Sequence, residues 1–499
     1  MHGDRIRNKE CAGKIMEPGQ AAAMVKDGMT LGCSGFTPAG YPKCVPMALA
    51  GRVTEGGENL RVTLCTGASV GDELDGSLAR AKMVAKRLPY QTTDDMRSAI
   101  NEGLTEYTDL HLSQVGQYVR YGFLGKIDLA IVEAVAITED GHIVPSTSVG
   151  CTPSYVQMAE KVIVEVNTTQ PLDLMGMSDI YTPEDPPGRK PIPILKADDR
   201  IGTPYIPCGS EKIAAVVMCG IKDGTRALAP VDEAARAIAG NLIDFFENEV
   251  RRGRLPVNLL PLQSGVGSVA NGVLAGLTGS RFENLSCYTE VVQDSMLDLI
   301  DAGKTGAVSC TSLTLSGGGL KRFYEGIGRY RDVIIMRPQE ISNNPEVARR
   351  LGVIAMNTAI ECDIYGNVNS THIMGSRMMN GIGGSGDFAR NGYLTIFTTE
   401  STARKGAVSS IVPMCSHVDH TEHDVMVIIT EQGVADMRGL SPKERAKVVI
   451  NNCAHPDYRP MLRDYFERAA AGSFRHTPHL LREALSWHAR FSETGSMKA

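Results

Sequence analysis

The sequence has no long apolar run and no cluster of basic residues. No apolar stretch approaches the roughly 18 residues that a helix needs to cross a bilayer, and the first ten residues are charged rather than leader-like. Lys and Arg number 51 against 57 Asp and Glu, a balance that argues against a nucleic-acid-binding surface. We therefore expect a cytoplasmic protein that acts on small molecules, with no membrane and no nucleic-acid partner.

Paired cysteine motifs are also missing. The chain has twelve cysteines, but no two of them form a C-x-x-C pair, so dispersed reduced thiols are predicted. Several lie in apolar runs such as Ala215–Cys219, where a thiol packs as a small core side chain. The best metal-site candidate, His417–Asp424, shows no Glu and His pattern on a clear helix, and we interpret it as a hydrogen-bonded loop. We predict no metal site and no permanently bound cofactor.

Short apolar runs alternate with helical stretches along the 499 residues. Near-continuous apolar strands separated by helices are typical of a buried, mainly parallel sheet, so the predicted fold class is α/β. The length is too great for one compact core, and several domains are expected. The predicted strands are Arg61–Leu64, Leu129–Val132, Val162–Val164, Val333–Met336, Leu394–Phe397 and Val425–Ile429.

A faint internal repeat suggests two similar halves. Ala136–Thr147 resembles Ile360–Thr371, since each contains an apolar run, an acid, a glycine turn and a Ser-Thr pair. Recurrence of this kind indicates two related α/β domains. Polar and turn-forming residues gather at Asp223–Pro230, so we place the domains at residues 1–224 and 225–499, with a ligand site expected in the cleft between them.

The segment 259–290 is the most informative part of the chain. It predicts a strand, a glycine turn at Gly265 and Gly267, a helix, a second strand and then Glu290. Glycines allow close backbone approach to a ligand, and a helix that starts after them offers unpaired N–H groups to an anion. An acid about twenty residues after a G-x-G-x-x-A turn is also where a dinucleotide-binding fold holds a ribose hydroxyl. The segment alone leaves both interpretations open.

Two further glycine-rich loops, Asn380–Phe388 and Thr430–Asp436, follow Glu290. Together with Ser264–Asn271 and Tyr288–Val291, they resemble the acetyl-CoA hydrolase/transferase family of class I CoA-transferases, which includes succinyl-CoA:acetate CoA-transferases. The resemblance covers nearly the whole chain. It implies two tandem open α/β domains of CoA-transferase type, with mainly parallel sheets and the nucleophile in the C-terminal domain.

The resemblance implies that Glu290 is the nucleophile of a ping-pong reaction. Its carboxylate would attack an acyl-CoA to form a mixed anhydride, and the released CoA thiolate would convert the anhydride into a glutamyl-CoA thioester. An incoming carboxylate would reverse these steps and leave as the new acyl-CoA. CoA is then a substrate, and the net exchange needs neither ATP nor metal. A carboxylate acts in this way when it is positioned and partly desolvated.

The resemblance also assigns the remaining site residues. The backbone N–H groups of Val266 and Gly384 would form the oxyanion hole, and Asn343 and Glu431 match polar active-site positions. Arg226 would hold the substrate carboxylate bidentately. Arg404 stands where relatives more often carry lysine, and Lys405 follows it, so either cation could meet CoA. The positions matching CoA contacts are Gly265, Val266, Gly267, Ser268, Val269, Asn380, Gly384 and Arg404.

Three other functions compete with transfer. Water could discharge the same glutamyl intermediates, which would make the protein an acetyl-CoA hydrolase. A nicotinamide-dependent oxidoreductase would rest only on the glycine turn and Glu290, and a non-catalytic CoA-binding module would not need Glu290 for chemistry. The sequence leaves the acid pair open among acetate, propionate, succinate and 4-hydroxybutyrate. Relatives are commonly dimers, so we expect a homodimer.

Overall fold

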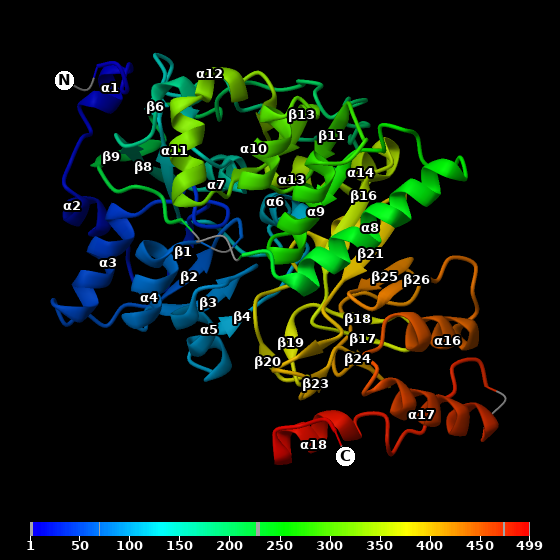
Figure 1. The fold of residues 1–499 in the computed structure, drawn as a ribbon. Coiled ribbons are helices and arrows are strands. Elements are labelled where there is room, and N and C mark those ends of the chain that lie inside the picture. Colours follow the sequence, from blue (N-terminus) through cyan, green and yellow to red (C-terminus); the bar gives the residue numbers. More distant parts are fainter. Residues whose placement is uncertain (1–2, 69, 226–229, 473–474, 499) are drawn as a thin grey trace. The chain divides into compact units, whose positions relative to one another are not determined.

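The computed structural model describes residues 3–68, 70–225, 230–472 and 475–498, and the chain divides into two compact units. The first unit comprises Met1–Ala227, Ser286–Ile300 and Gly306–Leu351, and the second comprises Leu228–Leu285, Asp301–Thr305 and Gly352–Ala499. Each unit combines helices with mainly parallel strands (Figure 1), so the predicted α/β class is confirmed. The homologous domains at residues 1–224 and 225–499 stay a prediction, because the units group residues by contact and not by ancestry.

The first unit is built on a seven-stranded sheet in the order β4-β3-β2-β1-β5-β8-β9. All neighbouring strands run parallel. All six residues of β5 are buried, as expected for a parallel strand that helices cover on both faces. The bounds are β1 Thr30–Gly32, β2 Val62–Cys65, β3 Val84–Leu88, β4 Glu106–Tyr107, β5 Leu129–Ala134, β8 Lys161–Asn167 and β9 Ile213–Cys219.

Helices α3, α4 and α5 lie beside the blue strands of this sheet in Figure 1. Their side chains and those of the strands form one apolar core that includes Leu49, Leu64, Leu78 and Ile131. The N-terminal helices of the unit are α1 Lys9–Ala12, α2 Pro18–Ala22, α3 Cys44–Thr54, α4 Ser77–Arg80, α5 Asp94–Asn101, α6 Leu112–Arg120 and α7 Thr152–Met158. The later segments add α10 Asp294–Asp301, α11 Gly317–Glu325, α12 Ile327–Tyr330, α13 Gln339–Ser342 and α14 Pro345–Leu351.

Those later segments also carry strands. Strand β13 pairs in parallel with β15, and β12 pairs in parallel with β14. The loops that follow these short strands carry polar residues of the candidate site. The bounds are β11 Leu285–Tyr288, β12 Val291–Val292, β13 Thr305–Cys310, β14 Ser312–Leu313 and β15 Ile334–Met336.

In the second unit, strands β10, β16, β21, β25 and β26 follow one another in this order. The first four are parallel, and β26 adds an antiparallel edge through a hairpin from β25. Their bounds are β10 Leu262–Ser264, β16 Ile354–Thr358, β21 Leu394–Thr398, β25 Val427–Thr430 and β26 Gly433–Asp436. Every one of the six apolar runs predicted to be strands overlaps a strand, which confirms that part of the sequence analysis.

The helices of the second unit follow local sequence patterns, both in how they begin and in which face they bury. Helix α16 begins with Pro442 after Ser441, whose side chain forms a capping box with Glu444. Helix α8 buries Ile238, Leu242 and Phe246 on one face, at the spacing of an amphipathic helix. The helices are α8 Glu233–Arg251, α9 Ser268–Thr278, α15 Ser385–Ala389, α16 Pro442–Asn452, α17 Arg459–Ala471 and α18 Ser486–Thr494. The predicted strand, turn, helix and strand of 259–290 correspond to β10, α9 and β11.

The internal repeat corresponds to two similar hairpins, one in each unit. In the first unit β6 (Ala136–Ile137) pairs antiparallel with β7 (Ile143–Val144), and in the second β17 (Glu361–Asp363) pairs antiparallel with β18 (Val368–Asn369). A glycine with positive φ closes each hairpin, Gly141 at 81° and Gly366 at 99°. The remaining short strands are β19 His372–Ile373, β20 Arg377–Met378, β22 Thr402–Ala403, β23 Val408–Ser409 and β24 Ile411–Val412.

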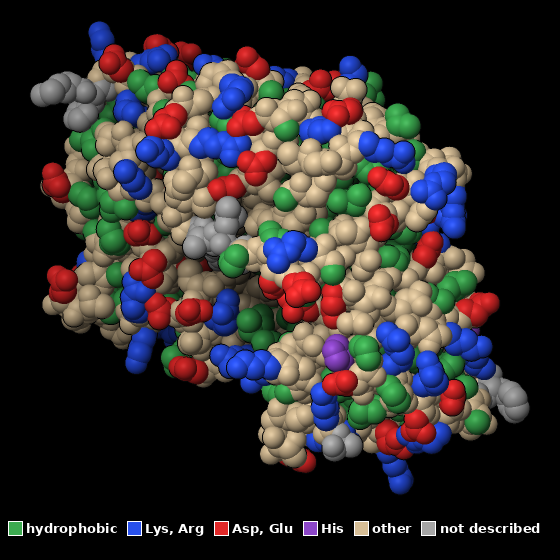
Figure 2. Space-filling model, in the orientation of Figure 1, with side chains coloured by type: hydrophobic (Ala, Val, Ile, Leu, Met, Phe, Trp, Pro, Cys, Tyr) green, Lys and Arg blue, Asp and Glu red, His purple; other side chains and the backbone are tan. Residues whose placement is uncertain are grey.

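The surface is mixed in charge. Figure 2 shows Lys and Arg side chains interspersed with Asp and Glu on the face that it draws. Within the described residues, no helix has both the length and the apolar character that crossing a bilayer requires.

Candidate active site

Glu290 lies in the first unit, in the short connection between β11 and β12. Its carbonyl oxygen accepts the backbone N–H groups of Thr311 (2.8 Å) and Ser312 (3.2 Å). The preceding residue, Thr289, is fully buried, and its N–H donates to the carbonyl of Ser309 at 2.9 Å. The main chain is thus fixed on both sides, while the Glu290 side chain remains half-buried. A carboxylate held in this way is positioned without being fully removed from solvent.

Asn343 orients the Glu290 carboxylate. Its side-chain amide donates to Glu290 Oε1 at 2.6 Å, and Asn343 itself is fully buried at the end of α13. The buried Ser342 hydroxyl donates to Asn343 Oδ1 at 2.7 Å, which sets the amide so that its NH₂ faces Glu290. The structure therefore brings the predicted pair Glu290 and Asn343 together. It adds Ser342, a residue that carries no recognisable signal in the sequence.

Asn343→Ala is expected to lower the rate of the CoA transfer that the family resemblance implies by roughly 10- to 100-fold, because a hydrogen bond to a charged group contributes about 1.5–3 kcal/mol. Ser342→Ala should show a smaller loss in the same direction, since the amide then loses the contact that sets its orientation. Steady-state rates with the purified variants check both expectations.

The matched control is Asn344→Ala. Asn344 is also buried, but its side chain contacts the carbonyl of Glu340 and the N–H of Glu346 instead of Glu290. It should keep wild-type turnover per folded molecule. Equal losses in the Asn343 and Asn344 variants would contradict the orienting role.

The predicted glycine turn lies in the second unit, between β10 and α9. Gly267 precedes the first residue of α9 with a φ of 121°, a conformation that L side chains rarely adopt. Val266 exposes 44% of its surface although it is apolar. Ser268 and Val269 form the first turn of α9, whose N–H groups have no acceptor within the helix. The turn therefore presents backbone donors at the surface of its unit.

A histidine side chain contacts the second glycine-rich loop, Asn380–Phe388. Gly384 immediately precedes α15, and the Ser385 hydroxyl donates to the carbonyl of Ile382 at 2.7 Å. His420 Nε2 lies 3.1 Å from the same hydroxyl, and its ring packs against Phe397 with centroids 4.7 Å apart. The predicted hydrogen-bonded loop around His420 thus supports the residue that follows Gly384.

The two amides predicted to form the oxyanion hole are available as donors. Within the part of the chain that the structure describes, neither the N–H of Val266 nor that of Gly384 has an acceptor. A backbone donor without a partner is costly unless solvent or a ligand satisfies it. Both groups can therefore serve a developing negative charge.

The remaining predicted residues of the second unit lie in ordered loops. Glu431 accepts the backbone N–H of Ser401 at 2.8 Å and the side-chain amide of Gln432 at 3.0 Å. Burial would raise the pKa of Glu431, but hydrogen bonds from Ser401 and Gln432 lower it overall, so this side chain is a carboxylate. Arg404 has a φ of 50°, and its guanidinium lies 5.2 Å from the ring centroid of Phe491. Asn380 lies two residues beyond β20.

The predicted residues are divided between the units. Glu290 and Asn343 belong to the first, and Gly265–Val269, Asn380, Gly384, Arg404 and Glu431 belong to the second. Arg226, the predicted carboxylate clamp, lies outside the described residues. Sequence reasoning missed Ser342 and Ser401, which contact Asn343 and Glu431, because isolated serines carry no pattern that marks such contacts. It predicted a hydrogen-bonded loop around His420 but not the contact of this histidine with Ser385.

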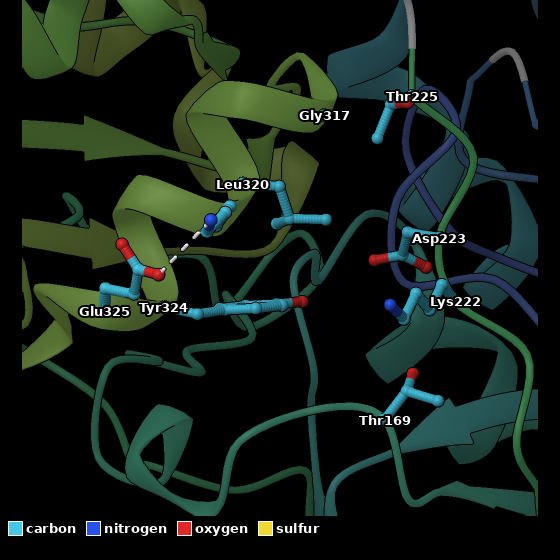
Figure 3. Close-up of a pocket in the computed structure, with 9 residues that line it drawn as sticks. Thr169, Lys222, Asp223, Thr225, Gly317, Leu320, Tyr324 and Glu325 are labelled. Atoms are coloured by element: carbon cyan, nitrogen blue, oxygen red, sulfur yellow. Dashed lines mark ion pairs between the residues drawn. The ribbon is translucent and has the colours of Figure 1, made fainter.

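The first unit also contains a pocket of about 550 Å³ (Figure 3). In the figure, the Tyr324 ring extends from α11 towards Asp223 and Lys222, and the Tyr324 hydroxyl donates to Gln170 Oε1 at 2.6 Å. Glu290 does not line this pocket, so we assign the pocket no part in the chemistry at Glu290. The lining residues are Thr169, Lys222, Asp223, Thr225, Gly317, Leu320, Lys321, Tyr324 and Glu325.

Asp223 connects the pocket wall to a buried ion cluster, which consists of Lys43, Glu133 and Asp223. The Lys43 ammonium lies 2.5 Å from Glu133 and 2.9 Å from Asp223, and all three side chains are essentially inaccessible to solvent. Burial would lower the pKa of Lys43, but Asp223 and Glu133 raise it well above its usual value. Burial raises the pKa of Glu133 from 4.5 to about 7, although Lys43 opposes the shift.

This shift predicts a pH dependence of stability. Between pH 4.5 and about 7 the folded protein binds more protons at Glu133 than the unfolded chain does, so the contribution of Glu133 to the unfolding free energy falls as the pH rises through this window. We expect wild-type protein to lose more stability between pH 5 and pH 8 than Glu133→Gln, as measured by urea denaturation. Other groups titrate in both proteins, and identical pH slopes would contradict the prediction.

Comparison with known proteins gives consistent results. The chain matches the family model described as acetyl-CoA hydrolase/transferase N-terminal domain over residues 2–218 and the corresponding C-terminal domain over residues 319–466. It is 60% identical over 494 residues to succinyl-CoA:acetate CoA-transferase of Clostridium kluyveri, covering 99% of this chain and 92% of that protein. It is 47% identical over 509 residues to acetyl-CoA hydrolase of Neurospora crassa, covering 99% and 97%. The crystal structure of RipA from Yersinia pestis shares the fold, with a TM-score of 0.71, 22% identity and coverage of 92% and 98%.

Proposed function

Because the chain belongs to the acetyl-CoA hydrolase/transferase family, we propose that it is a CoA-transferase that moves CoA between a short-chain acyl-CoA and a free carboxylic acid. Succinyl-CoA and acetate are the proposed pair, since the 60% identical relative carries that name. The observation that supports the chemistry most directly is the contact between Asn343 and Glu290, which positions a half-buried carboxylate as a nucleophile.

The proposed reaction starts with attack of the Glu290 carboxylate on the thioester carbonyl of acyl-CoA. The tetrahedral oxyanion would be stabilised by the N–H groups of Val266 and Gly384, and losing one such donor typically costs about 3 kcal/mol of barrier. Collapse releases CoA thiolate and leaves an acyl-glutamyl anhydride. The thiolate then attacks the glutamyl carbonyl, which forms the thioester on Glu290 and releases the first acid.

An acceptor carboxylate completes the cycle by the same steps in reverse. It attacks the glutamyl-CoA thioester, the thiolate leaves and returns to the acceptor's carbonyl, and Glu290 is regenerated. One thioester is broken for each one formed, so the exchange needs no metal and no bound cofactor, and CoA serves only as substrate. Asn343 would orient the Glu290 carboxylate before each attack, and Glu431 would fix the loop at Ser401.

For the CoA site we propose the turn Gly265–Val269, Asn380, Gly384 and a cation at Arg404 or Lys405. Among the described residues, the N–H groups of Val266 and Gly384 have no acceptor, and this supports the assignment. Arg226 is proposed as the clamp for the substrate carboxylate on the resemblance alone. We also propose homologous domains at residues 1–224 and 225–499, a homodimer, and a cytoplasmic location, which fits a chain whose twelve cysteines are free in the structure.

Acetyl-CoA hydrolysis is the second candidate, favoured by the 47% identity to a protein of that name. The test is to incubate the purified protein with acetyl-CoA, with and without succinate, and to separate the CoA esters by chromatography. Succinyl-CoA that forms only with succinate supports transfer. Free CoA released at equal rates in both reactions would establish a hydrolase. No observation beyond the glycine turn and Glu290 favours a nicotinamide-dependent oxidoreductase.

A further inference from the structure

Two cysteines of the first unit, Cys44 and Cys219, lie side by side. Cys44 is the first residue of α3, and Cys219 is the last residue of β9. Their sulfur atoms lie within 4.8 Å of each other. Neither residue belongs to the predicted site for CoA or its acids, and neither takes part in the proposed chemistry.

The two thiols differ in access and in acidity. Cys219 exposes only 1% of its surface, whereas Cys44 is half-buried. The interaction with the Cys219 thiol lowers the pKa of Cys44, and a position at the start of a helix also favours a thiolate. The same interaction and burial raise the pKa of Cys219. The Cys44 sulfur is therefore suited to be oxidised first, and the Cys219 sulfur is suited to attack the oxidised Cys44.

A metal site at this position is poorly supported. Among the described residues, Cys44, Cys219 and Glu165 form the single group of three potential ligands close enough to share an ion. The Glu165 carboxylate already accepts the backbone N–H groups of Lys43 (2.7 Å), Cys44 (3.0 Å) and Val45 (2.6 Å). These bonds satisfy donors at the start of α3, and a structural zinc site would need a fourth ligand. Thiol chemistry is the better explanation of the pair.

We propose that Cys44 and Cys219 form an oxidation site at which hydrogen peroxide converts the two thiols into a disulfide. The Cys44 thiolate attacks one peroxide oxygen, the O–O bond breaks, and the departing hydroxide takes up a proton to become water. Cys44 is then a sulfenic acid. The Cys219 sulfur attacks the Cys44 sulfur, the S–O bond breaks, and the second hydroxide leaves as water with the proton that Cys219 gives up. Two electrons pass from the sulfurs to the peroxide.

The test uses the whole purified protein, reduced, freed of reductant and treated with hydrogen peroxide. It is then quenched in denaturant with N-ethylmaleimide and digested without reduction for mass spectrometry. We expect a peptide pair linked through Cys44 and Cys219 and a loss of two titratable thiols from the twelve per chain. Reduction with dithiothreitol should restore both thiols.

Two variants and an internal control make the result specific. In Cys219→Ser, oxidation should stop at a Cys44 sulfenic acid that dimedone traps, and in Cys44→Ser, Cys219 should stay reduced. Cys33 and Cys65 are the matched control, because they are neighbouring cysteines with fully buried side chains, one directly after β1 and the other at the end of β2. Burial raises the pKa of both, that of Cys65 to about 12, so they should remain thiols.

Three outcomes would overturn the proposal. The first is that Cys44 and Cys219 both stay reduced while surface methionines oxidise. The second is a disulfide that joins either cysteine to another residue, and the third is equal oxidation of the Cys33 and Cys65 pair. Stoichiometric binding of added zinc that is lost in Cys44→Ser would instead establish a metal site. Each measurement reads the thiols directly and is independent of whether the protein transfers CoA.

Discussion

Glu290→Ala is expected to lower CoA transfer by a factor on the order of 10⁴ or more, because it removes the proposed nucleophile. The fold should persist, since the substitution keeps the Glu290 carbonyl, which accepts the backbone N–H groups of Thr311 and Ser312. Glu290→Gln keeps the shape and an acceptor for Asn343, and should be equally inactive. Glu290→Asp withdraws the carboxylate by about 1 Å, and a misplacement of this size costs on the order of 10²-fold.

Rates and intact masses check this prediction together. Wild-type protein incubated with acyl-CoA should gain the mass of CoA less water, which marks the glutamyl-CoA thioester, and Glu290→Gln should not. The matched control is Glu346→Gln, which removes an acid from α14 that pairs with Arg350 at 2.9 Å. It should keep normal turnover and the covalent species. Full transfer activity in Glu290→Ala would refute the mechanism.

Lys43→Met is expected to destabilise the first unit by about 3–5 kcal/mol, the usual cost of removing one partner of a buried ion pair. The variant would leave Glu133 and Asp223 buried without their shared cation. It would also remove the donor that the carbonyl of Tyr41 accepts at 2.8 Å. Urea denaturation should show a lower midpoint, and in the extreme the variant would fail to accumulate as folded protein.

A second variant separates lost charge pairing from lost packing. Lys43→Met combined with Glu133→Gln leaves one acid instead of two, so it should recover part of the stability lost in Lys43→Met alone. Lys321→Met removes an exposed lysine whose pairing with Glu325 spans 3.8 Å, and it should leave the midpoint unchanged. Equal midpoints for Lys43→Met and the double variant would show that the carboxylates do not interact through Lys43.

Particular contacts show why the sequence was only partly predictive. The run Ala215–Cys219 was correctly interpreted as an apolar run in which the thiol packs as a core side chain, since Cys219 is buried at the end of β9. The position of Cys44 beside that cysteine was not foreseen, because it depends on where α3 meets the end of β9. The Lys43 cluster was missed for the same reason, since Glu133 comes from β5 and Lys43 and Asp223 come from two loops that are far apart in the sequence. Buried ions leave no periodic pattern in a sequence.

The sequence by itself determined the α/β class, the strands, the glycine turn before α9 and the family. Each of these depends on local chemistry or on residues that keep their order along the chain. Only the tertiary structure decided which side chains meet, including Glu290 with Asn343 and Cys44 with Cys219. The physical reason is that secondary structure follows periodic patterns over a few residues. A hydrogen bond or a thiol pair requires atoms within a few ångströms, and folding alone brings distant segments that close.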